Sequence, residues 1–242
     1  MKLFGTILAG LVGAAVLGTS LVGCGGSTID PSGDQSYVRA IHLASNVGAV
    51  DVLAGGATLT GNLSPLASFP AAGEPFAAVD RGETTVIVRP TGTTTNAIQG
   101  TIDLSGGDLV SIVAAGAGEV TPGGDDSYRL IRIADDASEL DRSRANLRVL
   151  HAAIGVGNVD VYLVPGSAEA VTGTPVLTNV ARYQVSALQA VAPGSYTIFV
   201  TPTGTTEAAI RREVTLTAGY FVVAAENTDG AALRVYGTAE LP

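Results

Sequence analysis

Hydrophobic and polar residues alternate in short runs along most of the chain, and turn residues separate the runs. In residues 196–201, Tyr196, Ile198 and Val200 would share one face of a strand, and Pro193-Gly194 supplies the preceding turn. No stretch has convincing helical periodicity. In the C-terminal part the pattern predicts strands near residues 146–153, 158–164, 184–192, 195–201, 210–216, 219–226 and 231–238. Short strands at such regular spacing predict an all-β fold of antiparallel β-sandwiches, Ig-like in architecture.

Several motifs occur twice, which indicates an internal duplication. The first two pairs are offset by 109 residues and the third pair by 112, so three extra residues entered the second copy. The pairs are Arg39-Ala-Ile-His42 and Arg148-Val-Leu-His151, Val50-Asp51-Val52 and Val159-Asp160-Val161, and Pro90-Thr-Gly-Thr-Thr94 and Pro202-Thr-Gly-Thr-Thr206. We therefore expect two tandem domains of about 100 residues, each able to bury its own core. Their predicted ranges are 37–134 and 145–242, joined by a solvated linker at 135–144.

The first 23 residues do not fit this β pattern. Lys2 precedes a nearly unbroken apolar run that reaches Val22, which is the pattern of a secretory signal peptide. Leu21-Val22-Gly23-Cys24 resembles the bacterial lipobox, in which small residues precede an obligatory cysteine. That resemblance implies cleavage before Cys24 after diacylation of its sulfur. An uncleaved transmembrane anchor, or ordinary secretion with an unrelated cysteine, are the alternatives.

Cys24 is the only cysteine in the chain, so it has no partner for an internal disulfide. Acyl chains such as palmitate on this residue would hold the protein on membrane lipid. An aspartate directly after the cysteine would resemble an inner-membrane retention signal, but this position is Gly25. The absence of that aspartate favours the outer membrane in a cell that has one. Residues 24–36 are otherwise small and polar, and they predict a flexible tether that spans roughly 20 Å.

Charge changes the picture by excluding a class of partner. Lys2 is the only lysine, so the chain beyond residue 23 carries 12 arginines against 22 acidic residues, a net charge of −10. Such a surface repels nucleic acid, and we expect no nucleic-acid partner. Tryptophan is absent, and glycine is abundant. Valine and threonine are also abundant, and high β-branched content with frequent glycine favours strands and tight turns over helices.

The repeated motifs resemble the domain-of-unknown-function family 4397. The second copy carries the whole pattern: Arg148, His151-Ala152, Val159-Asp-Val-Tyr162, Pro193-Gly-Ser-Tyr196 and Pro202-Thr-Gly-Thr-Thr206. The first copy departs from it, because Leu53 replaces the tyrosine and Arg81-Gly82-Glu-Thr84 replaces the Pro-Gly-x-Tyr turn. The resemblance covers roughly residues 37–242. It implies a β-sandwich on an exported or surface protein, often in tandem, and brings no activity, substrate or cofactor.

The two histidines of the chain occupy equivalent positions, each nine residues before an aspartate. His42 with Asp51, and His151 with Asp160, are therefore the candidate metal or catalytic pairs. One histidine and one carboxylate are too few for a zinc site. The favoured interpretation is structural, with each histidine on the apolar face of its strand and bonded to a neighbouring strand.

Other constellations leave alternatives open. Acidic residues gather near the predicted linker, and oxygen-rich acidic loops can bind calcium, although no EF-hand spacing is present. These residues are Asp125, Asp126, Asp135, Asp136, Glu139 and Asp141. The repeated threonine-rich turn could bond a glycan, but it is also ordinary hairpin chemistry. A hydrolase would need a nucleophile, and no Gly-x-Ser-x-Gly elbow occurs.

Together these observations predict a lipid-anchored protein of the cell envelope. We expect a non-enzymatic interaction or structural module that needs no cofactor. A ligand-binding module for calcium or a glycan is the alternative, and its partner could be a protein or a glycan.

Overall fold

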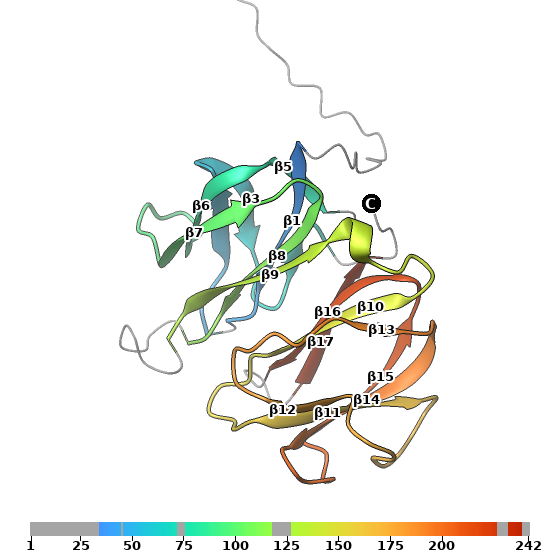
Figure 1. Ribbon diagram of the computed structural model, residues 1–242. Coiled ribbons are helices and arrows are strands. Elements are labelled where there is room, and N and C mark those ends of the chain that lie inside the picture. The colour runs from blue at the N-terminus through green and yellow to red at the C-terminus, as the bar shows by residue number, and fades with distance from the viewer. Residues whose placement is uncertain (1–33, 45, 72–75, 118–126, 227–231, 239–242) are drawn as a thin grey trace, which may run out of the picture.

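The computed structural model describes residues 34–44, 46–71, 76–117, 127–226 and 232–238 (Figure 1). The predicted signal peptide, Cys24 and nearly all of the predicted tether lie outside these residues. In the first half of the chain the strands are β1 (Gln35–His42), β2 (Val50–Ala54), β3 (Ala57–Leu63), β4 (Ser68–Phe69), β5 (Ala77–Asp80), β6 (Gly82–Pro90), β7 (Ile98–Leu104), β8 (Asp108–Ala115) and β9 (Arg129–Asp136).

A single turn of 3-10 helix, η1 (Ala137–Glu139), follows β9. The strands of the second half are β10 (Ala145–His151), β11 (Val159–Pro165), β12 (Leu177–Val180), β13 (Gln189–Val191), β14 (Gly194–Pro202), β15 (Ile210–Leu216), β16 (Gly219–Glu226) and β17 (Ala232–Thr238). Each predicted run of the second half overlaps one of these strands, with bounds that differ by a few residues. β12 was not predicted, because it is only four residues long and Asn179 interrupts it with a φ of 55°.

The two halves have the same strand order. Each half is a sandwich of two sheets, ordered β4-β1-β8-β9 and β3-β2-β6-β7 in the first and β13-β10-β16-β17 and β12-β11-β14-β15 in the second; β5 also pairs with β1. The all-β class and the sandwich architecture expected from the sequence are confirmed. The domain boundaries stay a prediction, because the equal strand order does not itself fix where one folding unit ends.

One pair of strands in each half is parallel, β1 with β8 and β10 with β16, whereas the other pairings of the described strands are antiparallel. These four strands are buried along nearly their whole length, as strands covered on both faces must be. In β16, Tyr220 and Val222 belong to one buried cluster, and Phe221 and Val223 belong to another. The near-continuous apolar sequence of these strands follows from this two-sided burial.

Each sandwich has its own core, and a third core lies between the halves. That shared cluster contains Ile41 and Leu109 from the first half and Leu150 and Tyr220 from the second. Figure 1 shows β8 and β9 lying beside β10 and β16, so the halves meet through the sheets that contain the parallel pairs. Burying a large apolar side chain stabilises by about 1.5–3 kcal/mol, so this cluster holds the halves together as one body.

The segment 135–144, which we expected to be a solvated linker, is partly packed. β9 continues to Asp136, and the Asp136 carboxylate accepts a hydrogen bond from the Ser138 amide at the start of η1. Ala137 and Leu140 are buried in the cluster between the halves. The sequence did not indicate that these two residues are buried, because the polar residues between them are exposed and make the segment resemble a solvated linker.

Candidate functional site

The two histidines lie at the ends of equivalent strands, His42 closing β1 and His151 closing β10. Both side chains are fully buried, on the inward faces that their strands direct at the sandwich cores. Each Nε2 donates a hydrogen bond to a backbone carbonyl, that of Gly48 at 3.0 Å and that of Gly157 at 2.9 Å. The bond reaches the loop that follows the strand, rather than a neighbouring strand as we expected. Each histidine therefore fixes the crossing from one sheet of its sandwich to the other.

The paired aspartates bond to different segments from the histidines. Asp51 Oδ1 accepts from the Asn62 amide and from the Thr91 hydroxyl, both at 3.0 Å. Asp160 accepts from the Asn179 amide at 2.7 Å and from the Gly204 amide at 2.9 Å. The Val-Asp-Val and Pro-Thr-Gly-Thr-Thr motifs therefore contact each other, because the aspartate carboxylate of the first accepts hydrogen bonds from the threonine-glycine turn of the second.

Electrostatics agrees with a structural role for these carboxylates. Burial of Asp160 raises its pKa, but the amides of Gly204 and Asn179 and the Thr203 hydroxyl together bring the pKa below the ordinary 3.8. The Asn62 amide lowers the pKa of Asp51 in the same way. Both groups stay ionised at neutral pH as hydrogen-bond acceptors that are already engaged.

The buried histidines predict a dependence of stability on pH. Burial lowers the pKa of His42 and His151 below 6.5, against the opposing effect of their bonds to loop carbonyls. As the pH falls through 6.5, the unfolded chain binds protons that the folded chain rejects, so the free energy of unfolding decreases until the folded pKa values are reached. We expect the melting temperature to fall between pH 7 and pH 5.

The control for this prediction is the double variant His42→Gln, His151→Gln. Glutamine keeps an N–H donor but does not titrate, so this variant should melt lower than the natural protein at pH 7 and lose the slope between pH 7 and pH 5. Calorimetry at half-unit steps of pH measures both. A slope that persists in the variant would contradict the assignment to the histidines.

The acidic residues near η1 are engaged in local structure. Asp141 accepts from the Ser143 amide and hydroxyl at 2.9 and 2.6 Å. Asp135 is paired with Arg148, whose Nε lies 3.0 Å from its Oδ1. The candidate calcium ligands Asp125 and Asp126 fall outside the described residues. Within the described ranges no three His, Cys, Asp or Glu side chains are grouped closely enough to hold a metal ion.

Each arginine of the Arg-x-x-His motifs lies in the contact between the halves, a role that the sequence did not indicate. Arg39 is 3% exposed, donates to the Ser111 hydroxyl at 3.1 Å and lies 4.7 Å over the centre of the Phe76 ring. Burial lowers its pKa from 12.5 to about 10, although Tyr220 and Tyr236 of the second half oppose the change. A guanidinium at that pKa is still charged at neutral pH, where the aromatic ring partly replaces lost hydration.

Arg148 makes the corresponding contact from the second half. It is bonded to Asp135 of β9, and Asp135 also accepts from the Tyr220 hydroxyl at 2.6 Å. The Asp135 hydrogen bonds raise the pKa of Arg148, so this guanidinium stays charged at neutral pH. The polar groups of the interface therefore join β9 of one half to β10 and β16 of the other.

An open groove runs between β7 and β9, the outer strands of the two sheets of the first half. Its volume is about 650 Å³, and its walls mix aliphatic with hydrogen-bonding side chains. Gln99, Thr101 and Asp103 lie on the β7 side, and Leu130 and Arg132 lie on the β9 side. No sequence motif marks this groove, because its two walls are about 30 residues apart in the chain.

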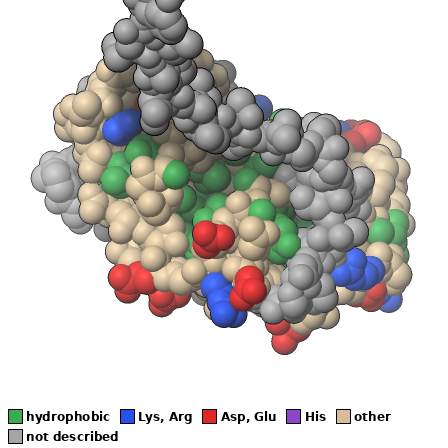
Figure 2. All heavy atoms as spheres, turned by 90° about the horizontal axis from the view of Figure 1, so that it is seen from above, with side chains coloured by type: hydrophobic (Ala, Val, Ile, Leu, Met, Phe, Trp, Pro, Cys, Tyr) green, Lys and Arg blue, Asp and Glu red, His purple; other side chains and the backbone are tan. Residues whose placement is uncertain are grey.

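Figure 2 shows one face of the molecule, on which apolar side chains gather near the centre with an acidic side chain beside them, and other charged side chains lie towards the margin. Several of the charges are paired at the surface, including Arg211 with Glu213 at 2.8 Å and Arg81 with Asp34 at 3.2 Å. Such exposed pairs contribute about 0–1 kcal/mol each and leave the charged groups accessible. In the described part of the chain there is no helix with the length and hydropathy needed to cross a membrane.

Comparison with known proteins gives one family. The profile of the family described as "Domain of unknown function (DUF4397)" matches residues 36–162, which is more than half of the chain. The match covers the first half and continues through β10 into β11. No curated protein matches the chain significantly.

Two solved structures of carbohydrate-binding modules are similar at low scores. The first, a family 26 module of Eubacterium rectale Amy13K in complex with maltoheptaose, is 13% identical, with 85% of this chain and 98% of that chain covered and a TM-score of 0.27. The second, a family 41 module from streptococcal virulence factors that recognises α-glucan, is 12% identical with the same coverage and a TM-score of 0.26.

Proposed function

Since this chain belongs to the DUF4397 family, a family of unknown function, we propose on that premise that it is a lipid-anchored protein of the bacterial cell envelope that acts as a non-enzymatic interaction module. We propose further that its second half is another copy of the family domain, on the basis of the repeated motifs. The interaction role is supported by the hydrogen bonds of the candidate catalytic side chains, which hold segments of the fold together. His42 and His151 are bonded to loops of their own sandwich. Asp51 and Asp160 are bonded to the neighbouring strands β3 and β12 and to the threonine-glycine turns.

The anchoring part of the proposal rests on the sequence before the first strand. The apolar run that ends at Val22, the small residue Gly23 and the single cysteine Cys24 form the lipobox-like arrangement. β1 begins at Gln35, so ten residues separate it from the cysteine. A tether of that length lets the sandwiches stand away from a membrane to which acyl chains hold Cys24.

Replacement of Cys24 by alanine tests the anchor. We expect Cys24→Ala to abolish both incorporation of an alkyne fatty acid and recovery of the protein with membranes, because the acceptor sulfur is gone. Ser27→Ala is the matched control and should keep both. Labelling of Cys24→Ala at the natural level, or a natural protein that takes up no label, would refute the anchor and leave the fold unaffected.

Glycan binding in the groove between β7 and β9 is a second candidate function. The groove has the size of an ordinary ligand site, and it offers the amide of Gln99, the hydroxyl of Thr101 and the carboxylate of Asp103 beside aliphatic surface. Calorimetry with a glycan panel, and with calcium and zinc alone, tests this candidate. Heat that disappears in Gln99→Ala but persists in Glu207→Ala would support glycan binding here, and no heat in any titration would remove it.

A further inference from the structure

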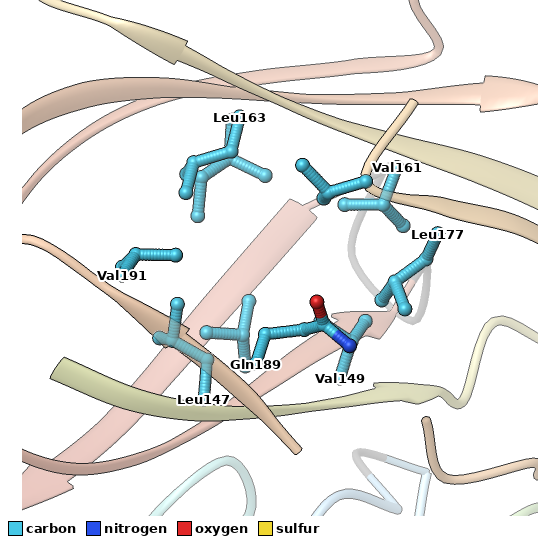
Figure 3. Close-up of a pocket in the computed structure, with 10 residues that line it drawn as sticks. Leu147, Val149, Val161, Leu163, Leu177, Gln189 and Val191 are labelled. Carbon is cyan, nitrogen blue, oxygen red and sulfur yellow. The ribbon is translucent and has the colours of Figure 1, made fainter. Parts of the chain in front are cut away.

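The second sandwich contains an apolar slot between its two sheets. The slot opens between β12 and β13, which are the outer strands of their sheets on that side. Its volume is about 30 Å³, and the residues that line it are Leu147, Val149, Val161, Leu163, Val176, Leu177, Gln189, Val191, Ile198 and Val223. Figure 3 shows the labelled side chains converging from the strands around this space, with the Gln189 amide as the only polar group among them.

The first sandwich carries an aromatic ring near the equivalent place. There β1 pairs with β4, and Phe69 of β4 lies opposite Ala40 and packs against the core. Val149 is the residue equivalent to Ala40, and Ser186 donates its backbone amide to the Val149 carbonyl at 2.8 Å. Ser186 therefore stands at the position of Phe69, so the second sandwich has lost an aromatic ring from this corner.

Ser186 does not turn its hydroxyl into the slot. The hydroxyl accepts from the Val149 amide at 3.0 Å and donates to the Ala187 carbonyl at 2.7 Å. A slot with aliphatic walls offers water few partners, and such spaces stay dry and take apolar molecules. At its mouth, Val176 is 43% exposed, the only large hydrophobic residue of the described chain with such exposure.

We propose that this slot binds the alkyl chain of a small single-chain amphiphile, with the polar end of the ligand held at the mouth by the Gln189 amide. The amide nitrogen makes only a long bond of 3.4 Å, to the Ala187 carbonyl, and can exchange it for a ligand oxygen. One water needs about 10–15 Å³ of such space, so the slot takes roughly two to three carbon groups. The inference depends on the sandwich alone and holds whether or not Cys24 carries a lipid.

A series of straight-chain alcohols from methanol to octanol, added to the purified protein and followed by methyl NMR, tests the proposal. We expect shifts confined to Val149, Val161 and Leu177, and an affinity that rises about fourfold with each CH₂ before it stops near propanol or butanol. The rise should stop because further carbons remain in water. An affinity that keeps rising to octanol, or equal shifts at Val52 and Val86 of the first sandwich, would overturn the slot as a site.

Two variants separate the slot from general hydrophobic binding. Leu163→Phe should occupy the slot and abolish the shifts at Val149 and Leu177. Because a phenylalanine there could also disturb the core, Val176→Ser is the second variant; it changes only the exposed mouth and should weaken propanol binding several-fold. Val214→Ser removes a partly buried valine outside the slot and should bind propanol as the natural protein does. Unchanged binding in Leu163→Phe, once it is shown to fold, would refute the proposal.

Discussion

Replacing Gly237 with valine is expected to destabilise the second sandwich by about 3 kcal/mol, at the upper end of the usual cost of overpacking. Gly237 of β17 is the cross-strand partner of Phe221 of β16, and the phenylalanine ring lies where a side chain of residue 237 would begin. A Cβ atom added at Gly237 would overlap ring atoms of Phe221. Because Phe221 belongs to the core of this sandwich, the ring cannot move aside without loss of packing. Urea unfolding followed by circular dichroism measures the change, since the chain has no tryptophan.

Two further variants test the cause of this loss. Gly48→Ala is the matched control, because nothing lies within 4 Å of the added Cβ, and it should change stability by less than about 0.5 kcal/mol. The pair Gly237→Ala and Phe221→Leu should be less destabilising together than the sum of the two single changes, because the smaller side chain makes room for the methyl group. Additive effects would contradict a direct clash between the two positions.

Replacing Asp135 with alanine is expected to cost about 3 kcal/mol and to weaken the contact between the halves. The change leaves the Arg148 guanidinium without its carboxylate and removes the acceptor of the buried Tyr220 hydroxyl. Breaking a buried ion pair by removing one partner costs about 3–5 kcal/mol, and the partial exposure of Arg148 places the expected value at the low end. The observable sign is separation of one thermal transition into two, as the sandwiches begin to melt independently.

The exposed pair of Asp141 with Arg144 supplies the comparison for this prediction. Both side chains are nearly half exposed, so Asp141→Ala should cost much less stability than Asp135→Ala and leave the melting curve unsplit. If Asp135→Ala and Asp141→Ala lowered the stability equally and left the melting curve unsplit, the buried network would not stabilise the contact between the halves.

Local patterns predicted much of this fold. The strands of the second half other than β12 overlap the predicted runs, because their alternation and the glycines between them act within a few residues. The Pro-Thr-Gly-Thr-Thr motifs predict an offset of 112 between the halves, and β8 and β16 follow these motifs in the chain. In the structure, Tyr37 pairs with Leu109 and Asn146 pairs with Tyr220, so those strands correspond with an offset of 111. A shift of one residue exchanges the two faces of a strand, and only long-range pairing fixes it.

The sequence identified the residues of the candidate site but not their hydrogen-bond partners. The repeat identified His42 and Asp51 as equivalent to His151 and Asp160, and the structure places these residues in equivalent surroundings. Their bonds to Gly48, Asn62 and the threonine turns could not be inferred, because each bond joins segments that only the folded sheets bring together. The alternation of β1 likewise could not show that Arg39 faces a second half of the chain rather than water.

The contact between the halves joins like surfaces, since each half presents the sheet that contains its parallel pair. A patch that recognises its own kind usually produces a symmetric dimer of separate chains. Here both surfaces belong to one polypeptide, so each is buried against the other within the same molecule. The two sheets that meet here are therefore not available to pair in the same way with a second copy of the chain.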